Sequence, residues 1–151
     1  MENIKFIYLY RDGGNYKKWA EVVFSNPTDL TPSVATLKLQ QAMTDGLFIA
    51  HQIRLPEVLS YLNGDLTPDD HCFHEFDSVE LTGDAPNDHL GRSISGFLTE
   101  VAREAQAGWR AFDPYDRLHT INEFFAFGLD RKSHIVSSKQ LTPMHRARAK
   151  Q

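Results

Sequence analysis

The chain opens with the run Ile4-Lys5-Phe6-Ile7-Tyr8-Leu9-Tyr10, in which most side chains are β-branched or aromatic. The run is apolar on both alternating faces except at Lys5, as expected for a strand inside a sheet. Residues 11–15 (RDGGN) have the composition of a tight turn, and we expect the two glycines to supply its positive φ angles. Residues 19–24 (WAEVVF) then predict the returning antiparallel strand.

Three helices are predicted further along the chain. Residues 31–46 begin with Thr31 as N-cap and a proline at the first helical position, and they end at an Asp-Gly pair. Residues 93–107 carry apolar side chains at i, i+3, i+4, i+7, i+8 and i+11, counted from Ile94. Residues 113–129 open with an Asp-Pro pair and keep apolar residues at helical spacing.

A third strand is predicted between these helices. Residues 71–82 (HCFHEFDSVELT) alternate imperfectly between apolar and polar side chains. The predicted class is therefore α+β: an antiparallel sheet of residues 4–10, 19–24 and about 72–81, with two or three helices packed on one face. With 151 residues, 41% of them hydrophobic and 24% charged, the composition is typical of one globular domain.

Charge is distributed unevenly along the chain. Residues 1–129 contain 10 Lys and Arg and 19 Asp and Glu, whereas residues 130–151 contain 6 Lys and Arg and 1 Asp. The net charge of −4 is therefore the sum of an acidic part and a basic part. We expect a globular domain of residues 1–129 followed by a basic C-terminal tail. The tail makes a nucleic-acid-associated factor one alternative function, although six basic residues without interleaved aromatics are few for that role.

The cellular location follows from two absences in the sequence. No uncharged run exceeds eight residues, which predicts neither a transmembrane helix nor the apolar part of a signal peptide. The single cysteine, Cys72, has no partner for an intrachain disulfide. We therefore expect a cytoplasmic protein that binds no membrane.

The first candidate site is the turn after the opening strand. Glycines let a backbone approach a ligand closely, and consecutive N–H groups can hold an anion. The candidate ligand-binding residues are Arg11, Asn15, Tyr16, Lys17 and Lys18. The glycine spacing is neither that of a Walker A loop nor G-x-G-x-x-G, so a solvated hairpin turn explains the same residues.

The second candidate site is the segment of residues 69–77 (DDHCFHEFD), which is rich in histidine and acidic side chains. Imidazole titrates near neutral pH, and carboxylates can act as bases or bind hard cations. On a strand, His71, Glu75 and Asp77 share one face, which makes them the candidate catalytic residues of a hydrolase with or without a divalent metal. The spacing matches no established metal motif, so we predict no metal site and no cofactor.

Aromatic side chains near the end of the predicted helical region indicate a surface for self-association. Trp109 and Phe112 lie around the turn between the last two helices, and Phe127 cannot point inward together with Phe124 and Phe125. Aromatic residues are enriched at the buried centres of interfaces. The predicted interface residues are therefore Trp109, Phe112 and Phe127.

Three short segments carry a resemblance. The run YRDGGNYK at residues 10–17, EVVFSNP at 21–27 and HEFD at 74–77 resemble a family of small bacterial and phage proteins to which no activity is attached. The resemblance implies an intracellular bacterial or phage source. The leading functional hypothesis comes from the residues instead: a small binding or regulatory protein that self-associates and captures a protein partner or an anionic, nucleotide-like ligand.

Overall fold

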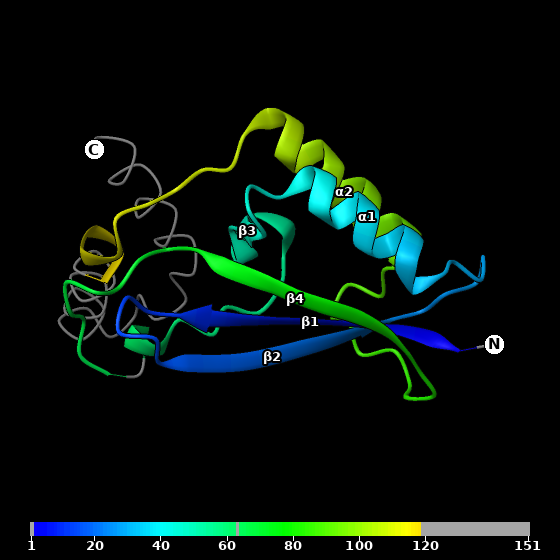
Figure 1. The fold of residues 1–151 in the computed structure, drawn as a ribbon, viewed down its shortest axis with the longest axis horizontal. Helices are drawn as coiled ribbons and strands as arrows, with labels where there is room; N and C mark the ends of the chain where they lie inside the picture. Colours follow the sequence, from blue (N-terminus) through cyan, green and yellow to red (C-terminus); the bar gives the residue numbers. More distant parts are fainter. Residues whose placement is uncertain (1, 63, 119–151) are drawn as a thin grey trace, which may run out of the picture. The chain divides into compact units, whose positions relative to one another are not determined.

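A computed structural model describes residues 2–62 and 64–118 of the chain (Figure 1). Four strands form one antiparallel sheet in the order β2-β1-β4-β3: β1 (Asn3–Arg11), β2 (Lys17–Phe24), β3 (Leu47–Phe48) and β4 (His74–Thr82). The helices are α1 (Pro32–Ala42) and α2 (Ile94–Ala107), the 3₁₀ helices η1 (Ala50–Ile53) and η2 (Ser60–Leu62), and residues 114–118. The predicted α+β class is confirmed, and α1 and α2 lie side by side on one face of the sheet.

The chain divides into two compact units, one of Met1–Ser60 with Phe73–Arg110 and one of Tyr61–Cys72 with Ala111–Gln151. The whole sheet and both long helices belong to the first unit. The predicted tail, residues 130–151, and most of the predicted helix 113–129 lie outside the described residues. Within the described part of the chain, no helix is both long and apolar enough to cross a bilayer.

The β1–β2 hairpin forms as predicted, but its turn uses a different residue. The strands pair from Ile4 with Phe24 to Arg11 with Lys17. The positive φ of the turn, 70°, belongs to Asn15, so the expectation that the glycines would supply it was wrong. Asn tolerates this left-handed conformation because its short polar side chain bonds locally, and here the Asn15 Oδ1 accepts a 2.6 Å hydrogen bond from Nη1 of Arg11.

Strand β4 starts at His74, two residues later than expected, and contains a bulge. Ile7 of β1 pairs with Ser78 and Tyr8 with Phe76, which leaves Asp77 as an extra residue on β4. A bulge of this kind re-phases the alternation of side chains. Phe76 and Val79 consequently both pack on the core, although they lie three positions apart.

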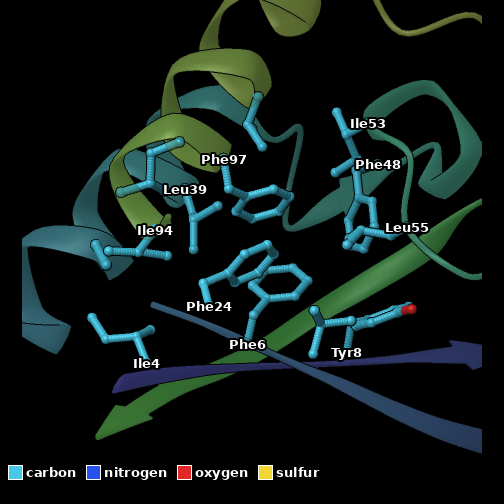
Figure 2. Close-up of a cluster of buried hydrophobic side chains, with 14 of the residues drawn as sticks. Ile4, Phe6, Tyr8, Phe24, Leu39, Phe48, Ile53, Leu55, Ile94 and Phe97 are labelled. Atoms are coloured by element: carbon cyan, nitrogen blue, oxygen red, sulfur yellow. The ribbon is translucent and has the colours of Figure 1, made fainter. Parts of the chain in front are cut away.

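The core lies between the sheet and the two long helices (Figure 2). The Phe24 and Phe97 rings stack with their centroids 4.3 Å apart, and Phe6 stacks on Phe76 at 5.5 Å. Burial of one such side chain is worth roughly 1.5–3 kcal/mol. The buried residues of the two helices are Ala35 and Leu39 of α1, and Ile94, Phe97, Leu98, Glu100 and Val101 of α2.

A buried arginine ties α2 to the segments beside it. The Arg92 guanidinium donates from Nε to Asp88, from Nη1 to Glu100 and the Ile53 carbonyl, and from Nη2 to Asp88 and the Arg54 carbonyl. These bonds use all five of its N–H groups. Its Cζ also lies 5.2 Å from the ring centroid of Phe97, so the position of α2 is fixed by charge as well as by apolar packing.

Candidate functional site

The structure joins the two candidate sites through one ion pair. Arg11 ends β1, and its guanidinium donates to both carboxylate oxygens of Glu75 on β4, at 3.1 Å from Nε and 3.0 Å from Nη2. The hydrogen bond to Glu75 is the main cause that raises the pKa of Arg11. The ion pair is bidentate and half-buried. The positive charge of Arg11 is therefore already paired, and both carboxylate oxygens of Glu75 already accept hydrogen bonds.

The other predicted ligand-binding residues are exposed on the hairpin. Tyr16 has an exposed fraction of 78%, and Lys17 and Lys18 at the start of β2 are also exposed. Sequence reasoning missed Trp19, which follows them with an exposed fraction of 54%. The hairpin therefore presents two basic and two aromatic exposed side chains at the end of its turn and the start of β2.

The remaining candidate catalytic residues, Asp77 and His71, form hydrogen bonds of their own. Asp77 is exposed at the bulge, and its Oδ2 accepts a 2.7 Å hydrogen bond from the hydroxyl of Ser78. His71 precedes β4 and belongs to the second unit, where its carbonyl accepts a 3.0 Å bond from the hydroxyl of Tyr61. Across the described ranges, no group of three His, Cys, Asp or Glu residues is placed to hold a metal ion.

Two of the predicted interface residues, Trp109 and Phe112, lie among the described residues, and both pack against other parts of the chain. Trp109 packs against the core, and its Nε1 donates to the carbonyl of Ala42 at 3.2 Å. Phe112 is buried, with the guanidinium carbon of Arg117 3.8 Å from its ring centroid. Phe127 lies outside the described residues.

A groove with a volume of about 690 Å³ lies between α1 and α2. Five of the ten side chains in its lining are apolar and five are polar. The lining residues are Leu30, Lys38, Gln41, Ala42, Ser95, Leu98, Thr99, Ala102, Ala105 and Gln106. A second pocket of about 390 Å³ lies within the other unit, between residues 66–70 and 113–115.

Two apolar side chains of α1 that are not part of the lining are exposed. Val34 and Leu37 have exposed fractions of 41% and 56%. Val34 precedes the lining residue Lys38 by four positions, and Leu37 precedes the lining residue Gln41 by four, so each lies one helical turn from the lining. The sequence contains a sign of this exposure. Val34 and Leu37 mark one apolar side of α1, and Ala35 and Leu39 mark another. Because only one side of a helix can pack on the sheet, one apolar side is left over.

Comparison of the chain with protein-family models, with curated proteins and with solved structures finds no match. Any function assigned to the chain must therefore rest on its own residues and geometry.

Proposed function

We propose that the chain is a small binding protein that captures a helical segment of a protein partner in the groove between α1 and α2. The observation that carries the proposal is the 690 Å³ groove together with the exposed Val34 and Leu37, each one turn of α1 from a residue of its lining. Exposed apolar side chains that adjoin a groove are characteristic of a surface that another molecule covers.

The shape of the groove favours a helix over an extended peptide. The α2 wall is lined by residues that recur at helical spacing from Ser95 to Gln106, a rise of roughly 16 Å or three helical turns. Ser95, Thr99 and Ala102 have short side chains, which let the backbone of a partner approach closely. An amphipathic helix with its apolar side turned inward fits such a surface through anchors at i, i+3, i+4 and i+7.

The single basic residue in the lining of the groove indicates which charge the partner would carry. Lys38 projects from α1 into the lining and forms no ion pair within the described residues. A carboxylate on the captured helix would satisfy it, which gives orientation more than affinity. The proposed partner is therefore an amphipathic helix with an acidic residue beside its apolar side.

The test places the photoreactive residue p-benzoylphenylalanine at position 37, beside the groove. The matched control carries it at position 81, where Leu81 of β4 is similarly exposed at 43%. We expect an adduct at position 37 that mass spectrometry maps to an amphipathic helix of one partner. Adding Ala102→Arg, which fills the groove from an exposed position, should remove this adduct. Identical adducts from both positions, or adducts that Ala102→Arg does not change, would contradict the proposal.

Capture of an anionic, nucleotide-like ligand on the hairpin ranks second. Lys17 and Lys18 supply charge, and Tyr16 and Trp19 could stack on a base. Neither pocket is lined by these residues, and Glu75 already neutralises Arg11. Titration with AMP and with inorganic phosphate, followed by the fluorescence of Trp19 and repeated with Trp19→Phe, tests this alternative; an unchanged signal in the native chain rules it out.

The other two alternatives rest on weaker support. A hydrolase would need Glu75 as a base or metal ligand, but Arg11 engages both of its oxygens, so we favour binding over catalysis. A nucleic-acid factor would use residues 130–151, which lie outside the described residues. A cytoplasmic location stays part of the proposal, supported by the presence of a single cysteine, Cys72, which cannot form an intrachain disulfide.

A further inference from the structure

The outer edge of β2 divides into a covered half and an uncovered half. β2 is an edge strand of the sheet. At its end, the Val23 N–H donates to the side chain of Asn87, the Val23 carbonyl accepts from the N–H of Asn87, and the Ser25 carbonyl accepts from the N–H of Ile94. Within the described parts of the chain, no main-chain hydrogen bond reaches the edge from Lys17 to Glu21.

The direction of the main-chain groups along this edge follows from the covered half. Residues two apart on a strand point their N–H and C=O groups to the same side. Because the groups of Val23 and Ser25 point away from β1, those of Lys17, Trp19 and Glu21 point away from it too. The edge therefore presents three donors and three acceptors, and unpaired edges of this kind are templates for another strand.

We propose that β2 of one chain pairs with β2 of a second copy, antiparallel and with the two-fold axis at Trp19. In this register Trp19 pairs with Trp19 of the partner subunit, and Lys17 pairs with Glu21 of the partner subunit. The three pairs formed by residues 17, 19 and 21 exchange about six main-chain hydrogen bonds. The two sheets become one continuous sheet with α1 and α2 of both copies on the same face.

Charge selects this register over its neighbours. The axis at Trp19 sets opposite charges across the edge twice, and side chains directly opposite on adjacent strands interact. Moving the axis to residue 18 would set Lys18 against the partner's Lys18. Moving it to residue 20 would pair Lys17 with the partner's Val23, whose main-chain groups already bond Asn87. The uncovered length, residues 17–21, matches the length that the Trp19 register uses.

The side chains of Trp19 and Glu21 can contact the second copy without disturbing the fold. Trp19 lies opposite Leu9 on β1, so two tryptophans side by side would extend one apolar strip across both copies. Glu21 contacts Lys5 at 3.4 Å, but Lys5 also has Asp84 at 3.5 Å and Glu80 at 4.0 Å. Glu21 can therefore turn to the partner's Lys17 without leaving Lys5 unpaired.

A charge swap in the full chain tests both the surface and the register. Sedimentation equilibrium from about 1 μM to about 1 mM should show a reversible species of twice the 17.2 kDa chain mass, weakened by salt. Lys17→Glu places like charges opposite each other and should raise the dissociation constant about tenfold. The double variant Lys17→Glu with Glu21→Lys restores the complementarity and should restore the dimer. Lys18→Glu, on the same strand but outside these pairs, should leave a dimer.

A cysteine cross-link provides the second measurement. Cα atoms of a hydrogen-bonded antiparallel pair lie about 5.5 Å apart, within the range of a disulfide. Trp19→Cys should therefore give a covalent dimer on oxidation, faster than Tyr16→Cys, whose position is even more exposed. In sedimentation, the inference is overturned if only the mass of a single chain is found at every concentration, if Lys17→Glu leaves the dimer intact, or if the double variant fails to restore the dimer. In cross-linking, it is overturned if the two cysteine variants form covalent dimers at equal rates. None of these outcomes involves the groove, so they do not bear on partner capture.

Discussion

Arg92 holds both carboxylate oxygens of Asp88, with Nη2 2.9 Å from Oδ1 and Nε 3.0 Å from Oδ2. The two side chains are nearly inaccessible, with exposed fractions of 10% and 1%. The pair lies four residues apart in the segment that leads into α2, and Glu100 of α2 accepts from the same guanidinium at 3.0 Å. A charge placed this deeply must keep its partners, which makes the cluster a sensitive point of the fold.

Replacement of Arg92 by lysine should lower the free energy of unfolding by about 3 kcal/mol. An ammonium group cannot reproduce the fork that bonds Asp88, Glu100 and two backbone carbonyls together. Urea unfolding of the native and variant chains measures the difference. Arg103→Lys, at an exposed position of α2, is the control and should change stability by less than about 0.5 kcal/mol. Equal effects of the two substitutions would show that the buried fork is not important.

Stability should fall in acid because of the same cluster. Burial alone would raise the pKa of Asp88, but the bonds and charge of Arg92 outweigh burial and hold that pKa below its ordinary value of 3.8. The bond from Arg54 is the main cause that holds the pKa of Glu100 below 4.5. A carboxylate with a lowered pKa in the folded state stabilises the fold above its ordinary pKa and loses this contribution as the pH falls through the lowered value.

Unfolding curves between pH 7 and pH 3 measure this loss against Asp88→Asn, which cannot ionise. The difference in stability between the native chain and the variant should be constant near neutrality and shrink below about pH 4. A difference that stays constant down to pH 3 would assign the acid sensitivity to other groups.

His74 should be needed for stability because of a single acceptor atom. It is fully buried, and its Nε2 accepts a 2.9 Å hydrogen bond from the N–H of Val58. His74→Leu leaves that N–H without its acceptor and should cost about 2 kcal/mol. His74→Gln keeps an acceptor at similar reach and should recover part of the loss in thermal unfolding. If the leucine variant were as stable as the native chain, this bond would contribute nothing.

Two neighbouring substitutions at the start of α2 should have opposite signs. Ser93 caps the helix by accepting from the N–H of Gly96 at 3.1 Å, so Ser93→Ala should cost about 1 kcal/mol. Gly96→Ala adds a Cβ at an ordinary 3.4 Å from the Ser93 hydroxyl and should stabilise by about 0.5 kcal/mol, because alanine is the better helix former. Denaturant midpoints of both variants decide the question; two shifts in one direction would contradict it.

The features that the sequence predicted well are those set by local patterns. The β1–β2 hairpin and α2 follow from alternation, turn composition and capping, which act over a few residues. The ion pair of Arg11 and Glu75 could not be predicted, because it joins residues 64 positions apart. The strand register that brings them together depends on how the whole sheet packs.

The groove between α1 and α2 was not predicted from the sequence, for a related reason. Val34 and Leu37 satisfy the same helical period as Ala35 and Leu39, so the pattern alone does not say which side of α1 meets the sheet. Packing decides: Ala35 and Leu39 are fully buried, while Val34 and Leu37 stay exposed. The proposal of a partner therefore rests on the exposed apolar side of α1, whereas two of the three aromatic residues predicted at an interface, Trp109 and Phe112, pack within the fold.

The bulge at Asp77 also determines where the chain can lose a residue. Deletion within a regular strand turns every following side chain to the opposite face. Here Phe76 and Ser78 already pair with adjacent residues of β1, so removal of Asp77 would leave a regular strand whose inward and outward positions are unchanged. Removal of Ser78 instead would place Asp77 in the same position opposite Ile7. Natural variants of the chain that are one residue shorter in β4 are therefore expected to have lost a residue at this bulge, whereas loss of a second residue would turn the strand beyond it to the opposite face.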